Sequence, residues 1–229
     1  MLKIATLHCF GSNPHKHATQ RSHFVHCVEA CGERAEWLCP PAPHRVASEV
    51  VYDLLKHRMG CTDEEVAAFG FEDPRCWFRS TDDGYLGLEA SMDYLAELCA
   101  RERPDGIAGY SNGAGAALLV AAARESGQPA FQSIRFLMSF AGPTSPAIQQ
   151  HIRDLLGPAR ERITLPTLIF GSRRDPMLVN AEQMASDLFE RCELALSDEP
   201  QRYANHALPE APERYETARR FLDAREPPR

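Results

Sequence analysis

A five-residue motif near the middle of the chain, Gly109-Tyr110-Ser111-Asn112-Gly113, restricts the local fold more than any other part of the sequence. Apolar residues 107–108 lead into it, and small apolar residues follow it. Glycines two positions before and after a serine let neighbouring backbones pass closely, so the serine can stand on a tight turn between a strand and a helix. The N-terminus of such a helix stabilises the anion formed when a serine attacks a carbonyl. The motif therefore predicts Ser111 as a nucleophile on a strand–turn–helix unit.

Short apolar runs alternate with helical patterns along the chain, which is typical of a parallel sheet with crossover helices. Strands are predicted at residues 3–8, 35–39, 105–110, 134–140 and 165–171, with a weak strand at 193–196. Helices are predicted at residues 18–31, 88–101, 112–124, 182–189 and 212–224. The 229 residues, of which 44% are hydrophobic, suffice for one domain with a sizeable core. We therefore expect a single α/β domain over residues 1–229.

The stretch from residue 44 to 85 interrupts this alternation, because it lies between a strand and its expected helix. It contains a helical piece at 48–58, then Gly60, and then a mixed segment with Trp77 and Phe78. An insertion beside the edge of a sheet is a natural lid or pocket wall. It can equally be a structural excursion with its own hydrophobic cluster, and the sequence leaves both interpretations open.

A serine nucleophile needs a base, and the base needs an acid that orients it. Where this motif carries catalysis, the order along the chain is serine, acid, histidine, so only His151 and His206 qualify as the base. His151 lies in a helical pattern, whereas His206 lies in a loop near the C-terminus and is the predicted base. Asp175 directly follows a predicted strand and is the predicted acid. The weaker alternatives for the acid are Asp187, on a helical pattern, and Asp198, in a polar loop.

Acyl transfer also needs two backbone N–H groups that hold the oxyanion. One belongs to the residue after the nucleophile, which is Asn112, and the other usually comes from a loop after an early strand. Residues 8–13 follow the first predicted strand. The N–H of Phe10 is therefore the predicted second donor of the oxyanion hole.

These motifs, in their order along the chain, resemble those of the family serine hydrolases, the FSH group of the α/β-hydrolase superfamily. The matching segments are His8-Cys-Phe-Gly-Ser-Asn13, Cys39-Pro-Pro-Ala-Pro43, Trp77-Phe78, Tyr85-x-Gly87-Leu88-Glu89, Gly109–Gly113, Gly171–Asp175 and His206-Ala-Leu-Pro209. One position departs from the family pattern, since Cys9 stands where the family usually has glycine. Glycine permits unusual backbone angles, so this departure bears on the geometry of the oxyanion loop.

The resemblance implies an α/β-hydrolase fold, with a mostly parallel sheet flanked by helices, and hydrolysis of esters or thioesters without a cofactor. Several fungal members are similar to hydrolases that release polyketide acyl chains from carrier proteins in secondary metabolism. An acyl thioester on an acyl carrier protein, or another small-molecule ester, is therefore the implied substrate. The same acyl-enzyme would serve an acyltransferase or cyclase in which another nucleophile replaces water. A non-catalytic binding protein with a hydrolase fold is the alternative from another class.

Charge and cysteine content disfavour several other functions. The formal net charge of −7 disfavours a nucleic-acid partner. No apolar run is long enough to span a membrane, and the N-terminus does not resemble a secretory signal. The eight cysteines are therefore expected to be free thiols in a cytoplasmic protein rather than disulfides.

Two further groups of residues are candidate sites. A helical pattern carries four possible zinc ligands, His23, His26, Cys27 and Cys31. One short helix closes a tetrahedral metal site poorly, so a zinc site is disfavoured. Cys9, beside His8, is a candidate thiol nucleophile, but no downstream partner pattern accompanies it. The nearby His15 and His17 are predicted to be exposed loop residues.

Overall fold

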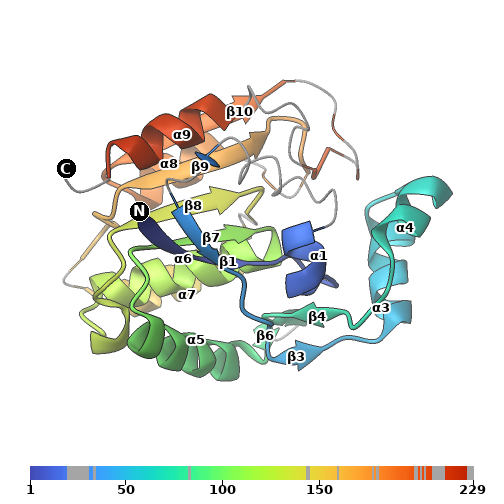
Figure 1. Cartoon of the computed structure of the whole chain (residues 1–229), viewed down its shortest axis with the longest axis horizontal. Helices are drawn as coiled ribbons and strands as arrows, with labels where there is room; N and C mark the ends of the chain where they lie inside the picture. The colour runs from blue at the N-terminus through green and yellow to red at the C-terminus, as the bar shows by residue number, and fades with distance from the viewer. Residues whose placement is uncertain are drawn as a thin grey trace.

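A six-stranded sheet forms the centre of the computed structural model, and every neighbouring pair in it is parallel. The structure describes residues 1–19, 31–32, 35–81, 84–142, 145–158, 160–176, 178, 181–198, 201, 203, 205–207 and 215–225. The strands are β1 (Leu2–Leu7), β2 (Ala35–Leu38), β7 (Gly106–Tyr110), β8 (Phe136–Phe140), β9 (Thr167–Ser172) and β10 (Cys192–Ser197). Their spatial order is β10-β9-β8-β7-β1-β2, so all their carboxyl ends meet at one edge (Figure 1).

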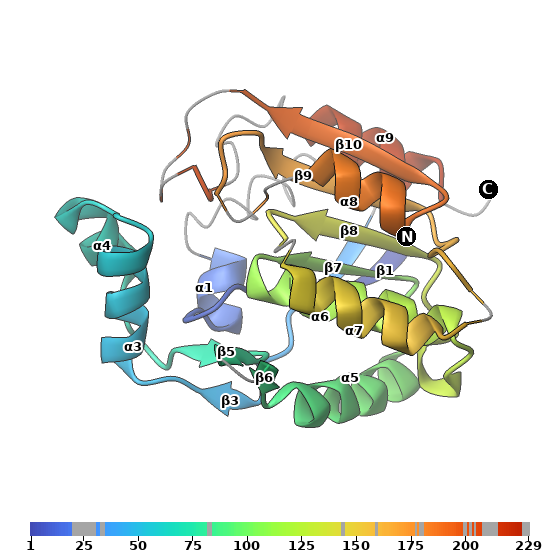
Figure 2. The same ribbon diagram turned by 180° about the vertical axis from the view of Figure 1, so that it is seen from behind.

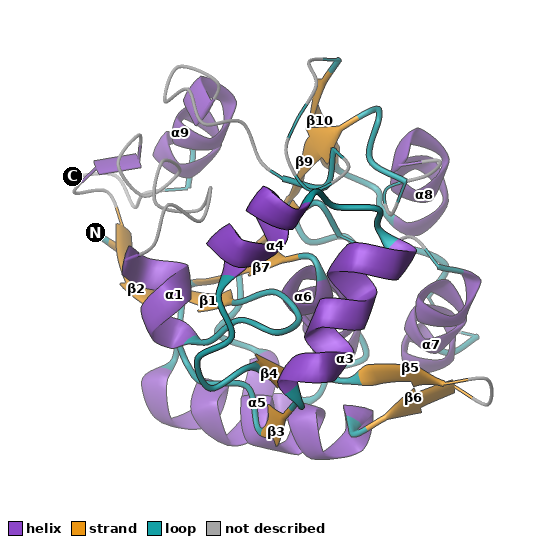
Figure 3. Cartoon of the chain, turned by 90° about the vertical axis from the view of Figure 1, so that its right-hand side faces the viewer, coloured by secondary structure: helices purple, strands orange, loops and turns teal. Residues whose placement is uncertain are grey.

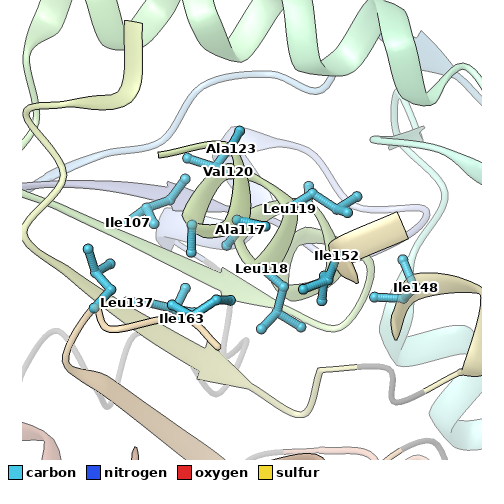
Figure 4. Packing of buried hydrophobic residues seen from close by; sticks show 14 of the residues in the cluster. Ile107, Ala117, Leu118, Leu119, Val120, Ala123, Leu137, Ile148, Ile152 and Ile163 are labelled. Atoms are coloured by element: carbon cyan, nitrogen blue, oxygen red, sulfur yellow. The ribbon is translucent and has the colours of Figure 1, made fainter. Parts of the chain in front are cut away.

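Helices cover both faces of this sheet, as Figures 1 and 2 show from opposite sides. One face packs against α5 (Leu88–Glu102), α6 (Asn112–Glu125), α7 (Pro146–Leu156) and α8 (Ala181–Leu188). The other face packs against α9 (Glu216–Asp223). Figure 4 shows the centre of the first layer, where the buried side chains of α6 meet those of β7, β8 and α7. The small residues of α6 let this helix lie buried on all sides next to the sheet.

The predicted strands agree with the observed ones to within two residues at each end. The weakly predicted strand at 193–196 is the edge strand β10, and the predicted helices 88–101, 112–124 and 182–189 correspond to α5, α6 and α8. The last predicted helix is shorter, because α9 begins at Glu216; residues 212–214 lie outside the described part. The sequence therefore predicted an α/β fold correctly, with small errors at the ends of elements.

The chain after β1 differs from its prediction. A helix, α1 (Pro14–Thr19), begins here, whereas a loop was predicted. The side chain of Asn13 accepts a hydrogen bond from the backbone N–H of Lys16 at 2.9 Å, and proline occupies the first helical position. His17 is consequently buried, so its predicted exposure was wrong, whereas His15 is exposed as predicted. Most of the predicted helix 18–31 lies outside the described residues.

The insertion at 44–85 lies beyond the carboxyl ends of the strands (Figures 1 and 3). Helix α3 (Ser48–Asp53) continues as the π-helix η2 (Leu54–Arg58), and α4 (Asp63–Phe69) follows. Two antiparallel pairs connect these helices to the body: β3 (His44–Arg45) with β4 (Arg75–Cys76), and β5 (Arg79–Thr81) with β6 (Gly84–Leu86). The insertion has its own buried cluster, formed by Val46, Val51, Leu55, Cys61, Val66 and Cys76.

None of the helices that the structure describes combines the length and the apolar character that crossing a membrane requires.

Candidate active site

The serine of the five-residue motif stands on the sharp turn between β7 and α6. Ser111 has φ +54° and ψ −116°, a strained combination for a residue with a side chain. A Cβ atom on Gly109 would lie 2.2 Å from the carbonyl oxygen of Gly113, and one on Gly113 would lie 2.1 Å from that of Leu7. Both positions need glycine because the backbones approach so closely. The physical reason for the motif therefore holds in this chain.

The predicted base and acid lie in hydrogen-bonded series with this serine. The Oγ of Ser111 is 2.7 Å from Nε2 of His206, and Nδ1 of His206 is 2.8 Å from Oδ2 of Asp175. Asp175 is 2% exposed and His206 is 6% exposed. An ionised carboxylate only accepts hydrogen bonds, so Nδ1 of the neutral ring carries the proton. Nε2 then has a free electron pair that faces the serine hydroxyl.

Loops at the carboxyl ends of β9 and β10 position the acid and the base. Asp175 follows β9 in a turn in which its N–H donates to the carbonyl of Ser172 at 3.2 Å. The N–H of His206 donates to the carbonyl of Tyr203 at 3.0 Å. Tyr203 and Asn205 have positive φ values of +51° and +67°, which curl the chain ahead of the histidine. The parallel sheet thus brings together segments that lie far apart in the sequence.

Tyr110 supports His206, a role that no sequence pattern indicates. Its hydroxyl donates to the carbonyl oxygen of His206 at 2.9 Å. Its ring stacks on the imidazole, with 5.7 Å between the centroids and 23° between the planes. Burial raises the pKa of Tyr110 well above its ordinary value, so the phenol stays a neutral donor. The residue occupies a variable position of the motif, and its partner is 96 residues away in the chain.

The alternative acids and the alternative base lie elsewhere. Asp187 is exposed and accepts a hydrogen bond from Gln183 on the same helix. Asp198 is exposed and lies 3.6 Å from the guanidinium of Arg173. His151 lies on α7, where its ring packs against a tyrosine. In the described part of the chain, none of these side chains makes a polar contact with the elbow serine.

The loop after β1 carries Phe10 beside the serine, and its geometry tolerates the departure at Cys9. The backbone of Cys9 lies outside the positive-φ region, so this position does not need glycine. Gly11 has φ +73°, and a Cβ atom there would lie 2.6 Å from a methyl carbon of Val51. Gly11 is therefore the residue in this loop for which glycine is required.

The predicted oxyanion donors are the backbone N–H groups of Phe10 and Asn112. Phe10 and Asn112 both line the cavity that contains Ser111. Within the described ranges, neither backbone N–H has a protein acceptor. Helix α6 begins at Asn112, and the first N–H groups of a helix have no partner inside it. Both groups are thus available to a ligand.

The side chain of Asn112 has a separate structural contact that the sequence did not indicate. Its Oδ1 accepts from the N–H of Trp77 at 2.8 Å, and its Nδ2 donates to the carbonyl of Phe78 at 3.1 Å. This pair of bonds attaches the end of the insertion to the elbow. The side chain is already occupied, so only the backbone N–H of Asn112 remains for an oxyanion.

The structure bears on one of the two rival sites, the thiol of Cys9. Burial raises the pKa of Cys9 to about 11, so this thiol stays protonated at neutral pH and is a poor nucleophile. Three of the four possible zinc ligands, His23, His26 and Cys27, lie outside the described residues. Among the residues with described positions, no group of three His, Cys, Asp or Glu side chains is arranged to hold a metal ion.

His8 braces the loop after β1 as a neutral ring. Its Nδ1 donates to the carbonyl of Cys9 at 2.9 Å, and its Nε2 accepts from the N–H of Ala42 at 3.1 Å. The indole N–H of Trp77 donates to the carbonyl of His8 at 3.0 Å. A protonated ring could not accept from Ala42, so this arrangement requires the neutral form.

We expect acid to destabilise the fold through His8 and His17. Burial lowers the pKa of His8 from 6.5 to about 4 and that of His17 from 6.5 to about 3. Between these values and 6.5, the unfolded chain binds protons that the folded chain does not, so stability rises with pH. The contribution is fully present above 6.5 and is lost as the pH falls toward 4, on the order of 3 kcal/mol for His8.

Urea unfolding at several pH values between 4 and 7 measures this effect. His17→Gln keeps a polar group near Thr6, whose hydroxyl lies 2.9 Å from the His17 ring, but it removes one titrating site. The slope of unfolding free energy against pH should become shallower in this variant. An unchanged slope would contradict the assignment.

The serine opens into a cavity of about 780 Å³, which is large enough for a drug-sized ligand. The insertion forms much of its wall. The contributing residues include Val50, Leu54, Met59, Phe69, Phe78 and Tyr85. The insertion therefore has both of the features considered from the sequence, since it has its own cluster and it borders the candidate site.

Comparisons with known proteins place the chain in a fold and a family. Human Esterase OVCA2 is 28% identical over 207 residues, which cover 83% of this chain and 83% of that protein. Zea mays acyl-protein thioesterase 2 has a TM-score of 0.57 at 19% identity, covering 97% of this chain and 93% of that one. Dienelactone hydrolase from Anabaena variabilis has a TM-score of 0.53 at 16% identity, covering 98% of this chain and 86% of that one. These two likenesses show the fold alone, which is that of the α/β-hydrolases. The model of the family described as serine hydrolase (FSH1) matches residues 1–217, and the chain belongs to this family.

Proposed function

We propose that the chain hydrolyses a carboxylic ester or thioester through Ser111 as nucleophile, His206 as base and Asp175 as the acid that orients the base. The observation that carries this proposal is the hydrogen-bonded series from Ser111 to Asp175, at 2.7 Å and 2.8 Å, in the wall of a cavity. Membership of the serine hydrolase family supports the same class of reaction.

In the first half of the reaction, Nε2 of His206 removes the hydroxyl proton of Ser111 as Oγ attacks the carbonyl carbon. Asp175 accepts from Nδ1–H and stabilises the imidazolium that forms. The negative oxygen of the tetrahedral intermediate is held by the N–H groups of Phe10 and Asn112. Their lack of a protein acceptor supports this role.

Collapse of the intermediate expels the alcohol or thiol, which takes the proton from His206. An acyl-enzyme on Ser111 remains, and the neutral His206 then activates a water molecule that attacks its carbonyl. A second tetrahedral intermediate collapses, releases the carboxylic acid and returns the proton to Ser111. The cycle uses only groups of this chain and water.

Residues 44–85 are proposed to act as a pocket wall or lid of one hydrolase domain that spans the chain. Their contribution to the cavity supports this role. The cavity volume of about 780 Å³ suits a long acyl chain, so release of a polyketide or another acyl chain from an acyl carrier protein stays within the proposal. Transfer of the acyl group to another nucleophile, or cyclisation, would follow if the wall excluded water from the acyl-enzyme.

A reducing, cytoplasmic compartment is proposed for the protein. In its support, several cysteines with described positions are free thiols, among them the buried Cys61, Cys76 and Cys99. Burial raises the pKa of Cys99 to about 12, which makes its thiol inert toward oxidation by exchange. Thiols of this kind fit a protein that does not depend on disulfides.

Labelling with a fluorophosphonate probe tests the proposal. The wild type should be labelled, whereas Ser111→Ala and His206→Ala should not. Ser145→Ala is the matched control, because Ser145 lines the same cavity but its hydroxyl bonds Tyr85 rather than a histidine. Labelling that persists in Ser111→Ala would identify a different nucleophile. A folded wild type that neither reacts with the probe nor hydrolyses p-nitrophenyl esters would favour the non-catalytic binding protein.

A further inference from the structure

A buried lysine lies in the wall of the cavity. Lys16 is 3% exposed, yet it lines the same cavity as Ser111 and His206. Its backbone N–H is held by the side chain of Asn13 at 2.9 Å, which fixes its position in the first turn of α1. The chain has three lysines in all, and this one is deeply buried in the proposed substrate site.

Neighbouring groups satisfy only part of the charge and hydrogen-bonding capacity of the Lys16 ammonium. Its Nζ donates to the carbonyl of Gly70 at 2.6 Å and lies 4.3 Å from the centroid of the Phe69 ring. An ammonium has three N–H donors, so two remain without a protein acceptor among the described residues. In that same part of the chain, no carboxylate lies within ion-pair distance of it. Burying a charge without an ion-pair partner costs free energy, and an anionic ligand in the cavity would offset this cost.

Most of the other charges of the cavity wall are also positive. Arg58 and Arg79 also line it, and Asp53 is its single acidic residue among those described. Asp53 lies 3.4 Å from the guanidinium of Arg58, so these two charges offset each other. Lys16 and Arg79 remain, and they make the cavity positive in a chain whose net charge is −7. Such a local field favours an anionic ligand.

We infer that Lys16 binds a carboxylate carried by the substrate, so that the preferred substrate is an ester or thioester of a dicarboxylic acid with one free carboxylate. A carboxylate matches the single positive charge and the two free donors of the ammonium. A phosphate has three acceptor oxygens and would need more donors than the ammonium of Lys16 leaves free. The inference rests on the proposed function, because it takes the cavity to be the substrate site.

Binding to the Ser111→Ala protein tests this without requiring turnover. The probes are p-nitrophenyl hexanoate and the mono-p-nitrophenyl ester of adipic acid, which differ by a terminal carboxylate. Calorimetric titration should give tighter binding of the charged ester. Adding Lys16→Met or Lys16→Gln should reduce this preference, expressed as the ratio of the two Kd values, by about tenfold. Lys16→Gln keeps a donor for the carbonyl of Gly70 and so preserves the contact between α1 and the turn after α4.

Lys56→Met is the matched control. It removes one positive charge from the insertion, but Lys56 pairs with Asp63 and does not line the cavity, so the preference should persist. Equal binding of the two esters by Ser111→Ala would overturn the inference even if a Lys16 variant failed to fold. So would a preference that survives both Lys16 substitutions, since Lys16 would then only brace the turn. The fluorophosphonate experiment tests the proposed hydrolysis separately. A negative result there would not change the measured ratio of Kd values.

Discussion

Replacing Ser111 by alanine is expected to lower kcat for a p-nitrophenyl ester by about 10⁶-fold. The substitution removes the only atom that forms the acyl-enzyme in the proposed reaction, while the methyl group fits the space of the hydroxymethyl group. Rates of p-nitrophenol release, measured for wild type and variant at equal protein concentration, give the loss in kcat. Circular dichroism and the midpoint of thermal unfolding should show that the variant remains folded.

His206→Ala should lower kcat by a similar factor, and the double variant should be little worse than either single one. The serine and histidine act in one proton transfer, so their contributions do not add. Each variant should still hydrolyse the ester about 10³-fold faster than the uncatalysed reaction in water, because the backbone N–H donors and the cavity remain. A double variant in which the two losses multiply would show that Ser111 and His206 act independently, and the proposed mechanism would be wrong.

The sequence was most informative where one local motif determines the geometry. The glycines on either side of Ser111 are needed because the backbones of β7, α6 and β1 touch there, and any larger residue would collide. The order of serine, acid and histidine then selected Asp175 and His206, because parallel strands place their following loops at one edge. Short-range rules therefore predicted residues that the structure brings within hydrogen-bonding distance.

Contacts over long distances in the chain were beyond these rules. Nothing local indicates that Tyr110 reaches the carbonyl of His206, or that the side chain of Asn112 holds residues 77–78. The burial of Lys16 likewise depends on the turn after α4, 54 residues further along. The helix α4 did have a readable signal, because Thr62 and Glu65 form a reciprocal capping box at its start.

Changing Asp175 to asparagine is expected to lower kcat by about 10⁴-fold while the cavity keeps its shape. The carboxylate accepts from Nδ1–H of His206 and so keeps the proton off Nε2. An asparagine amide would donate toward Nδ1, which would place the ring proton on Nε2 and remove the base. Because Asp175 is 2% exposed, water cannot easily substitute for the lost acceptor.

The pH dependence of the Asp175→Asn variant separates this mechanism from simple unfolding. If the loss arises from the wrong tautomer, activity should recover partly at high pH, where hydroxide replaces the general base, and the unfolding midpoint should change little. Asp198→Asn is the matched control, because this aspartate also follows a strand of the sheet but is 80% exposed and faces Arg173. If Asp175→Asn lost no more activity than Asp198→Asn, Asp175 would not be the residue that orients His206, and another acid would have that role.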